Sequence, residues 1–307
     1  MRVRVLGSAA GGGFPQWNCG CSNCRRLRFG SINATARSQA QLAVSTDDEH
    51  WFLLGASPDL RYQIEACGEL KPRTAGRNSP ISGVVLTSAD LDHALGLLLL
   101  REWQRLTLYS TATVRRTLLE TNTVFRLLER MPRQISWTDT SIGELFSLTT
   151  PEGIQSGIIA RLFALPGNLP GYSAPGSDLS SPEAVTALFL ESPSGARLAY
   201  IPGLPEISEA LLLELDACEA ILVDGTFWTD DELIRVEGFG RLANEIGHLP
   251  VSGPAGSMAR LSRLRTPRKI YVHINNTNPM LDEDSEEYRL VRKSGWEIAR
   301  DGMELSV

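Results

Sequence analysis

The sequence predicts an α/β fold in which helices cover β-sheets. Short runs rich in β-branched and aliphatic residues, separated by glycine and polar segments, recur along the 307 residues, and such runs are typical of strands. Helical patterns lie between several of these runs, and that mixture favours an α/β architecture. The expected strands are residues 3–6, 51–54, 84–87, 106–109, 197–201, 220–223 and 269–274.

Helical patterns and long polar segments complete the predicted organisation. Asp301-Gly302 lies between alternating residues, a pattern that predicts a closing edge hairpin. Segments 167–182 and 275–287 are rich in Pro, Gly, Ser, Asn or acidic residues and indicate long loops, but neither resembles an interdomain linker. We therefore expect one domain over residues 1–307. The expected helices are residues 91–102, 113–128 and 207–215.

Composition and charge narrow the class of function. A hydrophobic content of 42% is enough for a sizeable core, so disorder is not expected. The net charge of -6 offers no basic patch for a nucleic-acid backbone, which disfavours a polynucleotide substrate. The longest apolar run, residues 95–100, is far shorter than the roughly 18 to 20 residues that span a bilayer. Residues 1–7 alternate like a strand and do not resemble a signal peptide, so we expect a cytoplasmic protein.

Three of the five cysteines lie within six positions. Cys19, Cys21 and Cys24 follow one another on a glycine-containing turn, a spacing that wraps thiolates around one tetrahedral ion, for which zinc is the natural candidate. Three thiolates favour a structural site over a catalytic one, with a fourth ligand from a distant His, Asp or other donor. Three incidental buried thiols are the alternative. Cys67 and Cys218 stand alone, and the odd count argues against a disulfide framework.

The glycine-rich run at residues 7–13 directly follows the first predicted strand. It is not a nucleotide-binding GxGxxG turn, because the following residues 14–17 do not begin a helix. We expect instead a close approach of this backbone to the functional site or to the cysteine turn.

A strand-to-helix turn at residues 87–93 gathers polar side chains. Its spacing resembles the H-x-H-x-D-H motif of the metallo-β-lactamase superfamily, with Asp92 and His93 matching the final pair. Ser88 and Asp90 stand where the motif has its two earlier histidines, so one of the superfamily's two metal sites is missing. This departure disfavours two-metal hydrolysis of phosphodiesters or β-lactams.

Two further residues follow predicted strands in the order that the superfamily expects. Asp224 ends the strand at 220–223, where a bridging carboxylate is usual, and His273 follows the apolar residues 270–272. Each alone is more often a cap or a hydrogen-bonding group than a ligand. Together with Asp92 and His93 they predict one metal site. His248, in a glycine-bounded loop, is expected to transfer a proton or to complete a metal shell, whereas His50 is expected at the surface.

Longer blocks of sequence carry a more specific resemblance. Taken together, they resemble the pyrroloquinoline quinone (PQQ) biosynthesis protein B family nearly from end to end. The resemblance implies a metallo-β-lactamase-type αββα sandwich, a structural zinc on the cysteine turn, and an iron site for dioxygen-dependent hydroxylation of the tyrosine ring in the cross-linked Glu-Tyr precursor of PQQ. The blocks are residues 7–21, 92–102, 223–228, 247–253 and 272–279.

The residues independently predict a mixed Asp and His shell suited to Fe(II). We expect Asp92, His93, His273 and Asp224 as its ligands, with Asp92 and His248 as the catalytic residues. Because the chain departs from the family around residues 88–91, Asp90 is not assigned as a ligand, although it suits a supporting role.

Two alternatives to the hydroxylase remain. One is a metal-dependent hydrolase of the phosphodiesterase type, and the other is a carrier of PQQ or its precursor toward the periplasm, which would lack a membrane segment here. The expected partners of the hydroxylase are the peptide-derived precursor and dioxygen, with no nucleic acid and no membrane. The sequence leaves the oligomeric state open, a homodimer included.

Overall fold

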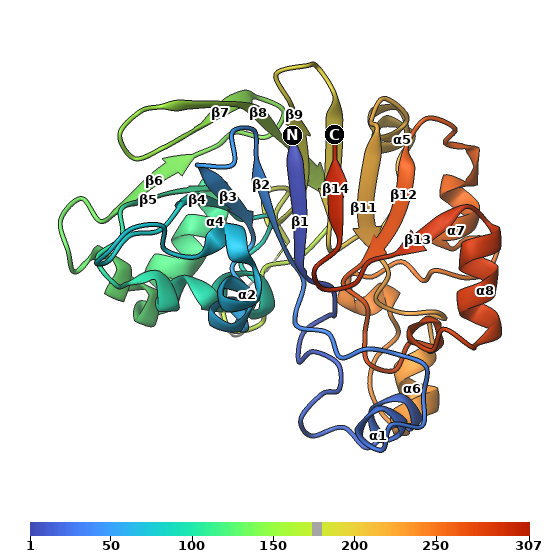
Figure 1. Ribbon diagram of the computed structural model, residues 1–307. Coiled ribbons are helices and arrows are strands. Elements are labelled where there is room, and N and C mark those ends of the chain that lie inside the picture. Colours follow the sequence, from blue (N-terminus) through green and yellow to red (C-terminus); the bar gives the residue numbers. More distant parts are fainter. Residues whose placement is uncertain (174–179) are drawn as a thin grey trace. The chain divides into compact units, whose positions relative to one another are not determined.

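The computed structural model describes residues 1–173 and 180–307, and the chain divides into two compact units. The first unit comprises residues 1–6, 41–197 and 302–307, and the second comprises residues 7–40 and 198–301. Each unit therefore combines segments far apart in the chain, as the colours in Figure 1 show. The predicted loop 167–182 lies partly outside the described residues, at 174–179. The expectation of one domain over 1–307 stays a prediction.

The first unit contains a seven-stranded mixed sheet with the strand order β14-β1-β2-β3-β4-β5-β6. Strands β3 to β6 run parallel, whereas β1 pairs with β14 and β2 pairs with β3 in antiparallel fashion. A second set, β7 to β9, is antiparallel throughout. The strands are β1 (Arg2–Gly7), β2 (Gln41–Ser45), β3 (Trp51–Leu54), β4 (Ile81–Val85), β5 (Leu106–Ser110), β6 (Ile135–Asp139), β7 (Leu145–Thr149), β8 (Gln155–Leu165), β9 (Val185–Glu191) and β14 (Glu304–Ser306).

Strands β2 to β5 are buried at every residue, as expected for strands of a covered sheet. Trp51, Leu108 and Phe125 are among the residues of their shared core. The helical segments are α2 (Leu60–Ala66), α3 (Leu91–Ala94), α4 (Ala112–Arg116), the 3-10 turns η1 (Gly68–Leu70), η2 (Leu95–Leu100) and η4 (Thr123–Glu129), and the π-helical turn η3 (Thr117–Thr121).

The two long helices predicted in this unit are interrupted. The segment that begins at Leu91 changes to a 3-10 turn after Ala94, and a Cβ at Gly96 would lie 2.2 Å from the carbonyl oxygen of Ser57. Only glycine permits this close backbone approach. The second segment passes from α4 through η3 to η4, so apolar spacing predicted helical residues but not one regular helix.

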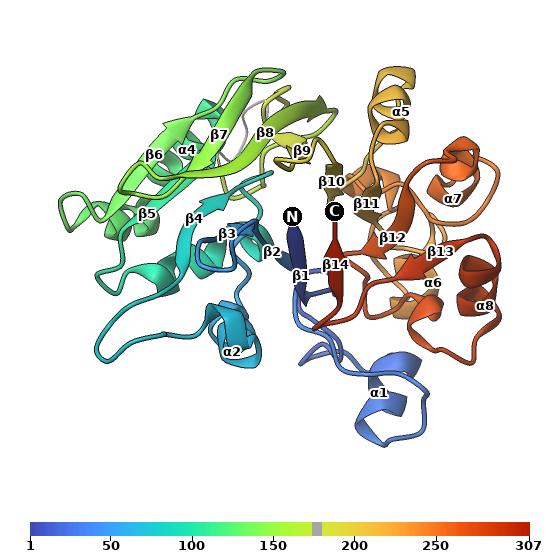
Figure 2. The same cartoon turned by 45° about the horizontal axis from the view of Figure 1, so that its top comes forward.

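The second unit contains four parallel strands, β10 to β13. Helix α8 lies against β13 (Figure 2), and the rings of Tyr271 and Trp296 stack with centroids 4.1 Å apart. The predicted helix at 207–215 is α5, which Ser208 caps through the amide of Leu211. The elements are α1 (Ser22–Arg28), β10 (Arg197–Ile201), α5 (Glu209–Asp216), β11 (Ala220–Asp224), α6 (Glu232–Glu237), η5 (Asn244–Ile246), α7 (Ser257–Arg260), η6 (Leu261–Arg263), β12 (Arg268–Val272), η7 (Pro279–Leu281), α8 (Glu286–Lys293) and β13 (Trp296–Ile298).

The predicted closing hairpin is wrong. Strand β13 pairs in parallel with β12, whereas β14 pairs antiparallel with β1, so the two strands beside Asp301-Gly302 have different partners. The Asp301 carboxylate accepts hydrogen bonds from Ser8 Oγ and from the amide and hydroxyl of Ser38. These bonds fix Asp301 to distant segments, and the turn does not fold its flanking strands onto each other.

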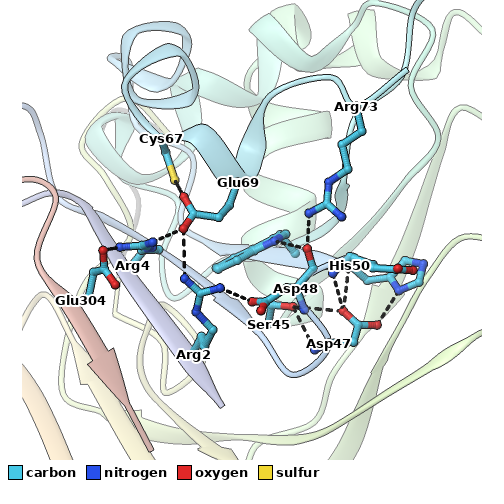
Figure 3. A network of polar contacts seen from close by, with 12 residues as sticks. Arg2, Arg4, Ser45, Asp47, Asp48, His50, Cys67, Glu69, Arg73 and Glu304 are labelled. Carbon is cyan, nitrogen blue, oxygen red and sulfur yellow. Dashed lines mark hydrogen bonds and ion pairs between the residues drawn. The ribbon is translucent and has the colours of Figure 1, made fainter. Parts of the chain in front are cut away.

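A network of charged side chains surrounds Glu69 in the first unit (Figure 3). Arg2 and Arg4 both donate to the Glu69 carboxylate, and Arg2 also donates to Asp48. His50 is part of the neighbouring turn, where its Nδ1 lies 2.7 Å from an oxygen of Asp47. This placement agrees with a histidine near the surface. Within 1–173 and 180–307, no helix combines the length and the apolar character needed to cross a membrane.

Candidate functional site

Polar side chains of the second unit meet where β11 and β12 end. Asp224 is the last residue of β11, and His273 directly follows β12. The two strands are parallel neighbours with Asp224 opposite Val272, so their carboxyl ends meet at the same edge. Ligand sites in parallel sheets form at this edge. Ligand atoms of Asp224, His273 and the loop residue His248 lie within 4.8 Å of one another.

Asp224 is fully buried, and its carboxylate accepts four hydrogen bonds. Oδ1 accepts from the amide and the hydroxyl of Thr226, at 2.8 and 2.5 Å, while Oδ2 accepts from the amide of Leu204 at 2.9 Å. Nδ1 of His248 lies 2.6 Å from Oδ2. Burial raises the pKa of Asp224, but the facing His248 and His273 and the Thr226 bond outweigh it, so the pKa lies below its ordinary value. The group is therefore held as a carboxylate.

The hydrogen bonds of the two histidines define their tautomers. Because Nδ1–H of His248 donates to Asp224, the lone pair of that ring is on Nε2. Thr226 Oγ1 has one proton, and the Asp224 carboxylate is its strongest acceptor, so Nδ1–H of His273 donates to Oγ1 across 2.8 Å. His273 therefore also carries its lone pair on Nε2. The two rings stack with centroids 5.4 Å apart, and Phe227 meets His248 edge-on.

The backbone at His273 is strained. Its φ of 58° lies in the left-handed region, which a residue with a Cβ seldom adopts. The hydroxyl of Thr226 lies 2.8 Å from the His273 carbonyl oxygen, and the amide of Ile274 donates to Ser8. These hydrogen bonds hold the His273 ring at the end of β12. The last contact also brings the run 7–13 against this segment, as the sequence predicted, and Ala9 bridges both Gln39 and Ile274.

Asp92 and His93 lie in the first unit, in the short helix α3 that follows β4. His93 is 5% exposed, and its Nε2 lies 3.9 Å from Oδ2 of Asp92. The backbone of His93 is fixed at both ends, since its amide donates to Asp90 and its carbonyl accepts from Ala56. The Asp90 carboxylate accepts from Ser88 Oγ at 2.8 Å, and its supporting role stays a prediction.

The cysteine cluster occupies the second unit at the start of α1. The sulfurs of Cys19, Cys21 and Cys24 lie within 4.8 Å of one another. Burial and the neighbouring sulfur of Cys21 raise the pKa of Cys19 to about 12, and burial also raises the pKa of Cys24. A cation must therefore displace protons to bind here, which is how zinc sites assemble. The donor set of three soft sulfurs fits zinc.

Sequence reasoning missed three residues of these sites. Thr226 links Asp224 to His273, Glu237 reaches the sulfur of Cys19 at 3.3 Å, and the side-chain nitrogen of Asn276 lies 3.1 to 3.6 Å from all three sulfurs. Thr226 and Asn276 belong to blocks 223–228 and 272–279, which carried the family resemblance. The sequence does not show which residues these two side chains contact, since Asn276 and Cys19, for example, are 257 residues apart.

Comparisons with known proteins place the chain in a family. The family model described as "Beta-lactamase superfamily domain" matches residues 50–274. Coenzyme PQQ synthesis protein B from Methylococcus capsulatus is 41% identical over 306 residues, which cover 99% of each chain, and that from Rhizobium meliloti is 44% identical over 99% of this chain and 97% of its own. The crystal structure of Zn(2+)-bound PqqB from Methylobacterium extorquens covers both chains fully, with 39% identity and a TM-score of 0.92.

These similarities first establish the fold and the superfamily of the chain. The fold is the metallo-β-lactamase-type αββα sandwich that the sequence predicted. The chain belongs to the coenzyme PQQ synthesis protein B family of the β-lactamase superfamily, which confirms the resemblance drawn from its sequence blocks.

Proposed function

We propose that this chain acts in coenzyme PQQ synthesis as an Fe(II)- and dioxygen-dependent hydroxylase of the tyrosine ring in the cross-linked Glu-Tyr precursor. The names of its relatives support the pathway. The observation that carries the chemistry is the buried carboxylate of Asp224, which orients the imidazole of His248 beside that of His273. A carboxylate that fixes a histidine tautomer is a recurring arrangement around metal and acid–base sites.

Asp92, His93 and His273 are the proposed iron ligands. Two imidazoles and one carboxylate match the donor set of non-haem Fe(II) oxygenases, which keep open positions for dioxygen and substrate. The tautomer of His273 supports this role, because its Nε2 carries the lone pair. The sequence also predicted Asp224 as a ligand, and that stays a prediction. Its four accepted hydrogen bonds use the roughly four lone-pair sites of a carboxylate, which favours an orienting role.

His248 is the proposed proton acceptor. Bound Fe(II) would supply the redox chemistry that activates dioxygen. Nε2 of His248 takes the proton of the substrate phenol, which raises the electron density of the ring that is to be hydroxylated. Asp224 then stabilises the imidazolium, since it is ionised and lies 2.6 Å from Nδ1.

The test removes one proposed iron ligand at a time. His93→Ala and His273→Ala should each abolish iron binding and hydroxylation together while the fold persists, because the strands do not need the ion. His50→Ala is the matched control, since His50 bonds to Asp47 in a turn of the first unit. Iron content by elemental analysis, circular dichroism and product formation by mass spectrometry are measured on anaerobically purified protein.

Zinc in the iron site should give a folded but inactive protein, because zinc has no redox chemistry. Hydroxylated product formed at full rate by zinc-loaded, iron-free protein, or by His93→Ala, would refute the hydroxylase. Such a result would return attention to the hydrolase and the carrier.

A further inference from the structure

Glu232 is a buried carboxyl group that the proposed mechanism does not use. It is the first residue of α6 and is 4% exposed. Its Oε2 accepts from the backbone amide of Trp228 at 2.5 Å, and its Oε1 accepts from the hydroxyl of Thr277. Trp228 lies in the β11 loop, residues 225–229, and Thr277 lies in the β12 loop, residues 273–278. One carboxyl group therefore joins the loops that follow these two strands.

A continuous path of hydrogen bonds leads from Glu232 to His273. Nδ2 of Asn275 donates to Oγ1 of Thr277 at 2.6 Å, and the hydroxyl of Thr277 donates to Glu232. The backbone amide of the same Asn275 donates to the carbonyl of Thr226 at 3.0 Å. The hydroxyl of Thr226 in turn bonds to Nδ1 of His273. Glu232 lies at one end of this path, and the ring of His273 lies at the other.

A second path leads from Glu232 to the loop of His248. The amide of Trp228 donates to Glu232, while its carbonyl accepts from the amide and the hydroxyl of Ser252, at 3.0 and 2.6 Å. The ring of the neighbouring Phe227 meets the ring of His248 edge-on. The same carboxyl group is therefore connected to the surroundings of both histidines.

The direction of the donated protons favours an ionised carboxylate at this position. The hydroxyl of Thr277 has one proton, and its oxygen accepts from Asn275, so its proton goes to Glu232. The other oxygen of Glu232 faces an N–H group, which only donates. A protonated Glu232 would bring an additional proton to two groups that already donate, and the path from Asn275 would be weakened.

Burial acts against this ionised state. It raises the pKa of Glu232 to about 7, although the hydroxyl of Thr277 and two backbone amides of the β11 loop donate to the carboxylate and lower the pKa. Because the folded pKa lies above the ordinary 4.5, the protonated form stabilises the fold at low pH, and this stability is lost as pH rises through about 7. Fold stability alone therefore does not account for a carboxylate here. The other titratable side chains of α6, its N-cap and the two loops are those of Asp231, Arg235, Glu237 and His273.

We propose that Glu232 positions the two imidazoles of the histidine site by fixing the β11 loop to the β12 loop. Its carboxylate keeps the hydroxyl of Thr226 at Nδ1 of His273 and keeps the loop of His248 beside them. This placement of the rings is independent of the proposed hydroxylase, and only the effect on turnover rests on that function.

Two pairs of variants of the full-length protein test the positioning role. Glu232→Gln keeps the shape but offers its two donors only one oxygen, and Thr277→Val removes the hydroxyl at similar volume. Both should displace the Nδ1 signals of His273 and His248 in nitrogen-15 NMR spectra of iron-free protein. With iron, both should lower turnover by roughly 10- to 100-fold, the usual cost of losing a group that orients a ligand. Thr277→Ser keeps the hydroxyl, and Glu209→Gln neutralises an exposed carboxylate of the same unit, so these two controls should match the parent.

The backbone amide of Trp228 gives an independent readout. Since it donates to Glu232, its proton signal should shift with an inflection near pH 7 in the parent, and this inflection should be absent in Glu232→Gln. A group that only supports the fold would change the melting temperature without moving the histidine signals. The signals of His50, in the first unit, serve as the internal reference.

Each outcome decides for or against the positioning role. Unmoved signals of His273 and His248 in both Glu232→Gln and Thr277→Val would overturn it, even if both variants melt at a lower temperature. A displacement in Thr277→Ser as large as that in Thr277→Val would overturn the path through the hydroxyl. If Glu232→Gln does not fold, the two Thr277 variants still decide. Displaced histidine signals, together with no hydroxylated product from the parent, would refute the proposed function and leave the positioning role intact.

Discussion

Asp224→Asn tests the role of the buried carboxylate with almost no change of shape. In the parent, four donors converge on two ionised oxygens: two from Thr226, one from Leu204 and one from His248. The asparagine side chain has one oxygen and one NH2 group. Whichever way the amide points, two of the four donors meet an N–H group in place of an oxygen.

The size of the effect follows from this mismatch. A buried N–H left without an acceptor costs about 1 to 3 kcal/mol, and a hydrogen bond to a charged group contributes about 1.5 to 3 kcal/mol. When the NH2 group faces Leu204 and His248, the Leu204 N–H is left without an acceptor and His248 loses its bond to a charged group. We therefore expect the free energy of unfolding to fall by about 3 to 5 kcal/mol. Turnover should fall as well, because the neutral amide stabilises the His248 imidazolium less than a carboxylate does.

Urea denaturation at neutral pH measures the stability, and product formation measures turnover. The control is Asp139→Asn, which removes an exposed ion pair with Arg115 and should change the stability by less than about 1 kcal/mol. If Asp224→Asn were as stable and as active as the parent, the carboxylate would not be the group that orients His248, and the proposed mechanism would fail.

Three further predictions concern the zinc site, the proton acceptor and the charged network. Cys21→Ser or Cys24→Ser should release zinc and lower the melting temperature, while Cys67→Ser should not, and full zinc content in the first two would contradict the site. His248→Ala should keep iron but lose roughly 10²-fold in turnover. Loss of iron in this variant would show that His248 is an iron ligand, and parent-like activity would show that it is a loop histidine without a catalytic role. Burial raises the pKa of Glu69, but hydrogen bonds from the backbone and from Arg4 lower it by more, so the pKa falls to about 2. Its ionised form thus stabilises the fold above the ordinary pKa of about 4.5, and this stability is lost as pH falls toward 2. Glu69→Gln should lower the urea midpoint at pH 7 and leave it unchanged near pH 2, and an equal loss at both would contradict the ion pairs.

The strands with dense apolar runs were predictable because burial on both faces demands such runs. Strand β3 has the predicted bounds, and β10 does as well. Strand β8 was missed although its positions alternate between more and less exposed, because Gly157 interrupts it and apolar residues such as Ile159 and Phe163 also fill its partly exposed positions. The hairpin at Asp301-Gly302 was mispredicted because a local turn pattern carries no information about the distant Ser8 and Ser38.

The candidate ligands could be recognised because chemistry restricts them to Cys, His and Asp after strands and on a tight turn. The residues that contact these candidate ligands could not be recognised from the sequence. Thr226 and Asn276 are common polar residues, and only the folded chain brings them to a histidine or to three sulfurs. The short fixed spacing of Cys19, Cys21 and Cys24 is readable from the sequence, whereas the contact of Asn276 with Cys19, 257 residues apart, has no spacing to recognise.

The distance along the chain between paired groups determines the order in which the protein can be completed during synthesis. Strand β1 pairs with residues 304–306, and the cysteine turn meets the segment around residue 276. At about 5 to 20 residues per second, the three thiols emerge from the ribosome many seconds before Asn276 is made. The contacts between the cysteine turn and this segment can therefore form only late in the synthesis of the chain.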